Sequence, residues 1–288
     1  MSVRPRAIIF ALGIGWAVAV LVTFTRMGNP VDAWCYYGFD PTNPWNPDGC
    51  FLYSPPVAQF MGAVRDVMPF EVFTFLLRSA EILVLVAVAG PAVGLALFIP
   101  AVAIELNAGN VNLLIVGAVL VGFRYPWAWA FVVLTKVTPG VGMLWFAVRR
   151  EWKSFAIAMG ATLGFAILSR LAAPNLWQQY FAGLNAEGDD SIFLIGWRLP
   201  VAAVVVVWAA RNDHRWALMV AVFLALPRWY FLSPVVLVGL FPLVRLPRPL
   251  PRPAFSWRPL AQPTMTPSAA AQTAAATSNG LTVRAPSS

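Results

Sequence analysis

Residues 7–25 read AIIFALGIGWAVAVLVTFT and contain no charged side chain. A helix of this length crosses the hydrocarbon core of a bilayer, which takes roughly 17 to 25 mostly apolar residues. Arg4 and Arg6 precede the stretch, as basic residues precede the apolar part of a signal peptide. No small-x-small cleavage site follows it, and more apolar segments come later in the chain. We therefore predict that it is retained as a first membrane span.

The composition of the whole chain supports a membrane protein. Of 288 residues, 59% are hydrophobic and 11% are charged, and the mean hydropathy is +0.71. A soluble domain is about a quarter charged, so this chain has more apolar surface than one core can bury. We predict an all-α, polytopic membrane protein. The net charge of +8 then reflects topology and contact with anionic lipids, and no nucleic-acid partner is expected.

Further apolar segments predict the remaining spans. They cover residues 70–89, 92–106, 111–123, 127–148, 154–172, 191–209, 216–226 and 231–244. The segment 127–148 is broken at Lys136-Val137-Thr138-Pro139, which predicts a hairpin that enters and leaves on the same side of the membrane. Counting this hairpin as two gives about ten membrane segments in a membrane domain of residues 1–244.

The basic residues predict the orientation. Lys and Arg concentrate in cytoplasmic loops, and here they cluster at both termini, after residue 148 and around residues 211–215. Both termini are therefore expected in the cytoplasm of an integral plasma (inner) membrane protein, and residues 26–69 form an external loop. Residues 245–288 are basic and rich in Pro, Ala, Ser and Thr, which predicts a disordered cytoplasmic tail.

Both cysteines, Cys35 and Cys50, fall in the predicted external loop. Outside the cytoplasm a disulfide persists, and the loop that it would close is short. Spacing alone does not define its geometry. The sequence is therefore compatible with a disulfide and with two unpaired thiols.

Ionisable residues in membrane segments are costly and mark candidate functional sites. Arg78 and Glu81 lie three residues apart on one helix, which predicts a structural pair. Glu105 lies at a span end, which favours a solvated loop position. Lys136, at the tip of the broken hairpin, is placed to meet an anion. A phosphate held by Lys136, Arg198 and Arg228 is one hypothesis for these cations, and snorkelling to lipid headgroups is the other.

Asp32 is the leading candidate carboxylate. It directly follows the first span and precedes the aromatic residues Trp34, Tyr36 and Tyr37. A carboxylate at the membrane surface beside aromatic side chains suits a general base acting on a sugar or acceptor hydroxyl. An ordinary loop aspartate is the alternative. Asp40 and Asp48 lie among Pro, Asn and Gly and are interpreted as turn residues.

The order of these motifs resembles a known family. The series comprises Asp32-x-x-x-Tyr36, Tyr53-x-Pro55-Pro56, Gly109-Asn110-Val111-Asn112, Lys136-x-x-Pro139, the basic residues 149–153, Asp190-Ser191 before Arg198, and Ser233-Pro234. Over residues 7–244 it resembles the GT-C membrane glycosyltransferases, and within them glycosyltransferase family 87, the polyprenyl-phosphate-mannose-dependent alpha-1,2-mannosyltransferases. Each motif alone is weak, and their shared order carries the likeness.

This resemblance implies a function. Family members pass a hexose, here expected to be mannose, from a polyprenyl-phosphate donor to a hydroxyl of an envelope glycolipid or glycan, with inversion, on the external face. The implied general base is Asp32, and the implied donor-phosphate ligands are Lys136 and Arg198, with Arg228 beside them. The substrate loops would contain Tyr36, Tyr53, Pro55, Pro56, Asn110 and Asn112. No cofactor or metal ligand is predicted, and a metal requirement stays open.

The chain also departs from the family pattern. It is short, Asn110 replaces a usual Gln, and Asp189-Asp190 replace an Asn-Gln pair. The single histidine, His214, falls on the predicted cytoplasmic side. A homologue that binds donor lipid without turnover, a transporter, and a scaffold of envelope biosynthesis are therefore alternatives. Paired broken helices in two related halves would favour a transporter, and the sequence has one clear break.

Overall fold

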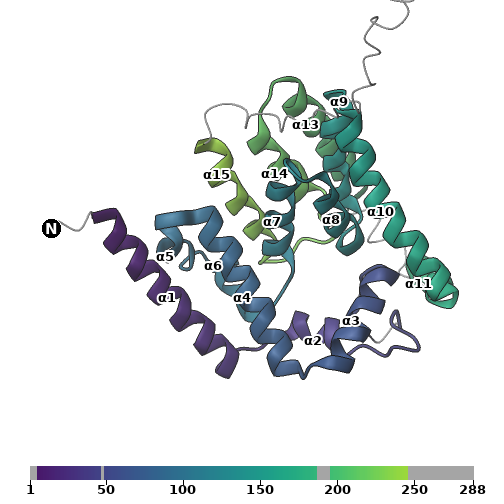
Figure 1. The fold of residues 1–288 in the computed structure, drawn as a ribbon, viewed down its shortest axis with the longest axis horizontal. Coiled ribbons are helices and arrows are strands. Elements are labelled where there is room, and N and C mark those ends of the chain that lie inside the picture. Colours follow the sequence, from purple (N-terminus) through teal and green to yellow (C-terminus); the bar gives the residue numbers. More distant parts are fainter. Residues whose placement is uncertain (1–4, 47–48, 187–194, 246–288) are drawn as a thin grey trace, which may run out of the picture. The chain divides into compact units, whose positions relative to one another are not determined.

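The computed structural model describes residues 5–46, 49–186 and 195–245, and every regular element in these ranges is a helix (Figure 1). In chain order the elements are α1 (Pro5–Met27), α2 (Val31–Tyr37), α3 (Pro55–Val67), α4 (Phe70–Ala89), η1 (Gly90–Ala92), α5 (Val93–Ala96), α6 (Pro100–Ala108), α7 (Asn112–Gly122), η2 (Pro126–Ala128), α8 (Trp129–Thr135), η3 (Thr138–Met143), α9 (Leu144–Val148), α10 (Trp152–Ala172), α11 (Pro174–Ala186), α13 (Arg198–Arg211), α14 (Arg215–Leu224), η4 (Ser233–Gly239) and α15 (Leu240–Arg245), where η marks a 3-10 helix. The all-helical class is thus as predicted. Asp48, Asp189, Asp190 and Ser191, and the predicted tail beyond Arg245, lie outside the described residues.

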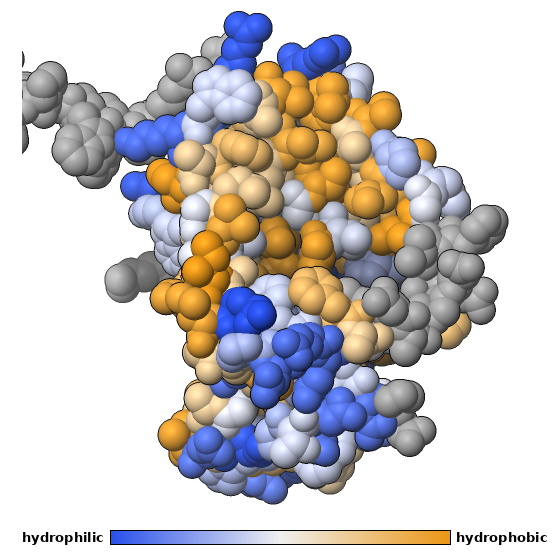
Figure 2. All heavy atoms as spheres, turned by 90° about the vertical axis from the view of Figure 1, so that its right-hand side faces the viewer, coloured by the Kyte–Doolittle hydropathy of each residue, from blue (hydrophilic) through white to orange (hydrophobic). Residues whose placement is uncertain are grey.

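Three helices in the described ranges are long and apolar enough to cross a membrane. They are Pro5–Met27, Phe70–Ala96 and Trp152–Ala172, and a fourth crossing results if α6 and α7, bent by 105°, count as one span. The other apolar helices are shorter, so about ten spans are not confirmed. The face drawn in Figure 2 carries a broad apolar zone with polar side chains above and below it, as expected of a protein in a bilayer.

The predicted span 92–106 is wrong. The helix that begins at Phe70 continues through η1 and α5 to Ala96, and a new helix starts at Pro100. Pro91 is tolerated because it lies in the first turn of the short 3-10 helix, where its missing N–H has no partner to lose. Pro100 opens α6 for the same reason. The helix therefore ends at Ala96, seven residues later than the predicted end at residue 89.

Small residues let α1 approach α5 closely. A Cβ added to Gly13 would lie 2.8 Å from a methyl carbon of Val93 and 3.0 Å from the backbone nitrogen of Gly94. In a membrane such contacts are the main source of helix association, since lipid removes the hydrophobic driving force. This contact holds the first span against the segment that leads to the candidate site.

The broken hairpin is present. Its two arms, Pro126–Thr135 and Thr138–Val148, flank Lys136 and Val137. The arms run antiparallel, because the ring of Trp129 near the start of the first lies 6.4 Å from that of Phe146 near the end of the second. Gly142 is required there, since an added Cβ would overlap the indole of Trp129. Lys136 is therefore at the tip of a chain that folds back.

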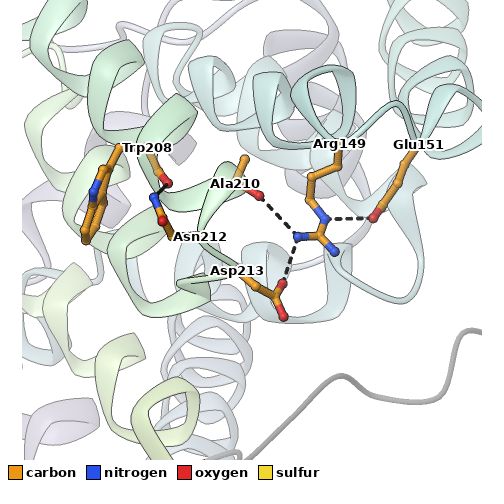
Figure 3. Close-up of polar contacts among 6 residues, drawn as sticks. All are labelled: Arg149, Glu151, Trp208, Ala210, Asn212 and Asp213. Carbon is orange, nitrogen blue, oxygen red and sulfur yellow. Dashed lines mark hydrogen bonds and ion pairs between the residues drawn. The ribbon is translucent and has the colours of Figure 1, made fainter.

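The open end of this hairpin lies at a basic end of the helical unit. Arg149 donates from Nε to Glu151 at 2.9 Å, and from Nη1 to Asp213 at 2.9 Å and to the carbonyl of Ala210 at 3.2 Å (Figure 3). The guanidinium of Arg215 lies 5.4 Å from the ring of Phe123 in the same region. The ends of α7, α9 and α13 and the start of α14 thus meet here, and the hairpin tip lies at the opposite end.

Candidate active site

Asp32 is held by an asparagine from a distant loop. It lies half-buried in the first turn of α2, and its Oδ2 accepts a hydrogen bond of 2.7 Å from Nδ2 of Asn110. The chain reaches Asn110 through Gly109, which ends α6 with φ +68°, a left-handed conformation that favours glycine. A Cβ on Gly109 would lie 3.0 Å from Cβ of Ala33. Close packing of α2 on this turn therefore positions the carboxylate.

Lys136 is held by a second asparagine of the same turn. Its ammonium donates a hydrogen bond of 2.6 Å to Oδ1 of Asn112, the first residue of α7. Nδ2 of Asn112 donates to Oε2 of Glu105 at 3.1 Å, and the backbone N–H of Leu113 donates to Oε1 of Glu105 at 3.1 Å. A chain of contacts thus links α6, α7 and the hairpin tip.

These two groups share one site. Lys136 interacts electrostatically with both Glu105 and Asp32, and the asparagines that hold Asp32 and Lys136 are separated only by Val111. The structure therefore brings together a carboxylate, an ammonium and two amides from α2, the α6–α7 break and the hairpin tip. Both breaks matter, because a helix interrupted inside a membrane is stable only where side chains or a cavity satisfy its backbone.

Two buried tyrosines lie next to Asp32. Tyr53 donates a hydrogen bond of 2.9 Å from its hydroxyl to that of Tyr36, one turn after Asp32 on α2. Burial, then the neighbouring tyrosine and Asp32, raise the pKa of Tyr36 above its ordinary value. Burial is also the main cause that raises the pKa of Tyr53. Both hydroxyls therefore stay protonated, as neutral hydrogen-bonding groups.

The Tyr-x-Pro-Pro motif attaches the segment between α1 and α4 to the hairpin. Oγ of Ser54 donates a hydrogen bond of 2.5 Å to the carbonyl of Leu134, two residues before Lys136. Pro55 and Pro56 open α3, where prolines lose no helical hydrogen bond. Earlier in the same segment, Cys35 and Cys50 form a disulfide with their Cα atoms 5.3 Å apart.

Arg198 holds a loop that borders this site. It is buried, donates from Nη1 to the carbonyl of Leu226 at 3.1 Å and from Nη2 to that of Pro227 at 3.0 Å, and lies 4.5 Å from the ring of Trp229. Arg228 is exposed on the same loop. The hydroxyl of Thr138 donates a hydrogen bond of 2.5 Å to the carbonyl of Ala225, which joins the loop to the hairpin near Lys136.

The interpretation of Glu105 as a solvated residue is wrong. Its exposed fraction is 0%, and its two oxygens accept the hydrogen bonds from Asn112 and Leu113. The signal that could have indicated this was its position, as the one carboxylate in an apolar stretch that ends in Asn107-Ala108-Gly109-Asn110. A buried acid in a membrane segment marks a functional or pairing position.

The predicted Arg78–Glu81 pair is also wrong. Arg78 donates instead to three backbone carbonyls, those of Leu106, Phe24 and Asn107. Glu81 is fully buried, and neither of its oxygens has a hydrogen-bond partner among the described residues. The carbonyls of Leu106 and Asn107 lie in the last turn of α6, where carbonyls lack intrahelical donors. The carbonyl of Phe24 also accepts from the backbone N–H of Gly28 at 3.0 Å. A guanidinium with five N–H donors can bond to all three.

No group of three or more His, Cys, Asp or Glu side chains in the described ranges is arranged to hold a metal ion. The site contains the carboxylates of Asp32 and Glu105, the cation Lys136 and amides, at the interrupted ends of apolar helices.

The comparison with known families indicates a membrane glycosyltransferase, and the apolar helices are consistent with that class. Residues 51–191 match the model of glycosyltransferase family 87, and the chain is assigned to this family on that segment. The matched segment contains Tyr53, Glu105, Asn110, Asn112 and Lys136, whereas Asp32, Arg198 and Arg228 lie outside it. No curated protein and no solved structure gives a significant match.

Proposed function

We propose that the protein transfers the hexose mannose from a polyprenyl-phosphate donor to a hydroxyl of an envelope glycolipid or glycan. The transfer inverts the configuration at the anomeric carbon, and Asp32 is the general base. One observation carries this proposal. Asn110 bonds to Asp32 and Asn112 bonds to Lys136, so that a candidate base and a candidate phosphate ligand are held by the same turn between α6 and α7.

The chemistry needs these two groups on opposite sides of the reacting carbon. The acceptor oxygen forms a bond to the anomeric carbon from the face opposite the phosphate, and its proton passes to a carboxylate oxygen of Asp32. The bond between the anomeric carbon and the phosphate oxygen breaks, and the electron pair leaves with the polyprenyl phosphate. Lys136 stabilises the negative charge that gathers on this leaving group.

The two arginines are proposed to act through the loop after α14. Arg228 is exposed on that loop and is the proposed second contact to the donor phosphate. Arg198 donates to the carbonyls of Leu226 and Pro227 just before it. We propose that Arg198 positions the loop that carries Arg228, because two of its N–H groups donate to backbone oxygens of that loop.

The proposed orientation follows the charges. The cluster around Arg149 and Arg215 would lie in the cytoplasm, and the opposite end, with Asp32 and Lys136, would face outward. The donor phosphate would then lie at the outer headgroup level, with its polyprenyl chain among the apolar helices.

The test compares two aspartates of the external segment. Membranes that contain Asp32→Asn are incubated with a radiolabelled polyprenyl-phosphate mannose and a membrane glycolipid extract, and transferred label is counted. We expect a loss of at least about a hundredfold, as for removal of a general base. Asp66→Asn is the control, since Asp66 is exposed at the end of α3.

Two outcomes would overturn the assignment. Transfer by Asp32→Asn at the rate of the Asp66→Asn control would remove Asp32 from the mechanism. Saturable donor binding with no transfer by the unmodified protein would favour a lipid-binding scaffold over an enzyme.

A further inference from the structure

We propose that Glu105 is a positioning residue, which acts through Asn112 to hold the ammonium of Lys136 in place for the donor phosphate. This inference rests on the proposed function, because it takes the phosphate as the ligand of Lys136. It concerns a residue buried behind the site, with an exposed fraction of 0%.

Both oxygens of Glu105 are engaged at the start of α7. Oε1 accepts from the backbone N–H of Leu113, and Oε2 accepts from Nδ2 of Asn112, each at 3.1 Å. The first N–H groups of a helix have no intrahelical partner, so Glu105 satisfies one of them from the end of the preceding helix. This anchors Asn112 across the 105° bend between α6 and α7.

The charges at the two ends determine how the amide of Asn112 is oriented. A carboxylate only accepts hydrogen bonds and an ammonium only donates them, whereas an amide does one on each side. Asn112 must therefore turn Nδ2 to Glu105 and Oδ1 to Lys136, as observed. A neutral amide at position 105 would place an N–H donor where a carboxylate oxygen now accepts, so Asn112 could bond to that donor only by turning Oδ1 away from Lys136.

The anchoring of Lys136 matters because Asp32 carries the opposite charge in the same site. Lys136 interacts electrostatically with both carboxylates, and its four-carbon side chain is flexible. An ammonium released from Asn112 would move toward Asp32, where it would occupy the base and leave the phosphate position. The relay Glu105–Asn112–Lys136 therefore keeps the cation and the base apart.

The first experiment measures binding of undecaprenyl monophosphate to the purified full-length protein in detergent, with undecaprenol as the lipid without phosphate. Glu105→Gln should weaken binding of the phosphate about tenfold, as expected when one charge-assisted hydrogen bond is misplaced. Binding of undecaprenol should not change. A general loss of structure would instead weaken both.

A swap variant tests the relay itself. Glu105→Gln combined with Asn112→Asp pairs every donor with an acceptor again. The N–H of Leu113 donates to the amide oxygen of residue 105. The amide N–H of residue 105 and the ammonium of Lys136 both donate to the new carboxylate at position 112. We expect the swap to bring phosphate binding back to within about threefold of the original value. Asn112→Asp alone places two carboxylates opposite each other, and it should bind the phosphate more weakly than the swap does.

Glu81→Gln is the matched control. It makes the same carboxyl-to-amide change at another fully buried position, one without a hydrogen-bond partner in the described ranges. It should bind the phosphate as the original protein does. An equal loss in Glu81→Gln, undiminished binding in Glu105→Gln, or a swap no better than Glu105→Gln would each overturn the proposal.

Lys136→Ala separates this inference from the proposed function. If Lys136→Ala weakens phosphate binding and Glu105→Gln does not, the relay alone is wrong. If neither variant weakens it, Lys136 is not a phosphate ligand, and both the relay and that part of the proposed function fail. Should Glu105→Gln fail to fold, Asn112→Ala removes the middle of the relay and leaves the bond from Leu113 to Glu105; undiminished phosphate binding by it overturns the proposal.

Discussion

Replacement of Arg78 tests how the helices around the site are held together. Its side chain is 2% exposed and donates to the carbonyl of Phe24 at 2.6 Å, to that of Leu106 at 2.9 Å and to that of Asn107 at 2.9 Å. These carbonyls belong to the ends of α1 and α6. Arg78 therefore ties the first span to the turn that presents Asn110 to Asp32.

The magnitude follows from the three bonds. A hydrogen bond to a charged group contributes about 1.5 to 3 kcal/mol, and a buried carbonyl left without a donor costs about 1 to 3 kcal/mol. The buried guanidinium itself carries a desolvation cost that its removal relieves. We expect Arg78→Leu to lower the free energy of unfolding by about 3 to 5 kcal/mol. Arg78→Lys should lose about half as much, since a point ammonium cannot match the fork of a guanidinium.

The assay is unfolding of the detergent-solubilised protein by increasing SDS, followed by the fluorescence of its tryptophans. Glu81→Gln serves in a double-mutant cycle with Arg78→Leu. The two side chains interact electrostatically but form no ion pair, so we expect a coupling free energy below about 1 kcal/mol. A coupling above about 1.5 kcal/mol, or a loss below about 1 kcal/mol in Arg78→Leu, would refute the carbonyl-clamp reasoning.

Three further variants test local features, each by unfolding in the same assay. Gly109→Ala should lower the free energy of unfolding by about 1 to 2 kcal/mol and reduce sugar transfer, because φ is +68° and the new Cβ would press on Ala33 beside Asp32. Unchanged transfer would show that α2 adapts. Cys35→Ser should lower the free energy of unfolding by about 3 kcal/mol, since the Cys35–Cys50 disulfide closes a loop of 15 residues. Mass spectrometry of non-reduced peptides checks the disulfide, and two free thiols would contradict it. Arg150→Gly should stabilise by up to about 1 kcal/mol, because Arg150 has φ 57°; a loss of stability would indicate a contact of its side chain.

The sequence alone predicted the membrane class, the first and second spans and α10, because a run of apolar residues reports directly on transfer to lipid. It also predicted the break at Lys136, since a proline in the interior of a helix removes a backbone hydrogen bond and clashes with the preceding turn. Asp32, Asn110, Asn112 and Lys136 were named as one group through the order of motifs in a family. None of these predictions required information on which helices pack against each other.

The partners of the buried charges depended on tertiary structure. Arg78 and Glu81 are three residues apart, yet Arg78 binds carbonyls contributed by two distant helix ends. Glu105 has an apolar local sequence, and its role arises only when α6 and α7 meet at 105° and bring Asn112 back to it. Hydropathy is a property of neighbouring residues, whereas a buried charge is stabilised by whichever unpaired polar groups the folded chain places beside it. Those groups come from segments far apart in the sequence, so only the fold decides the pairing.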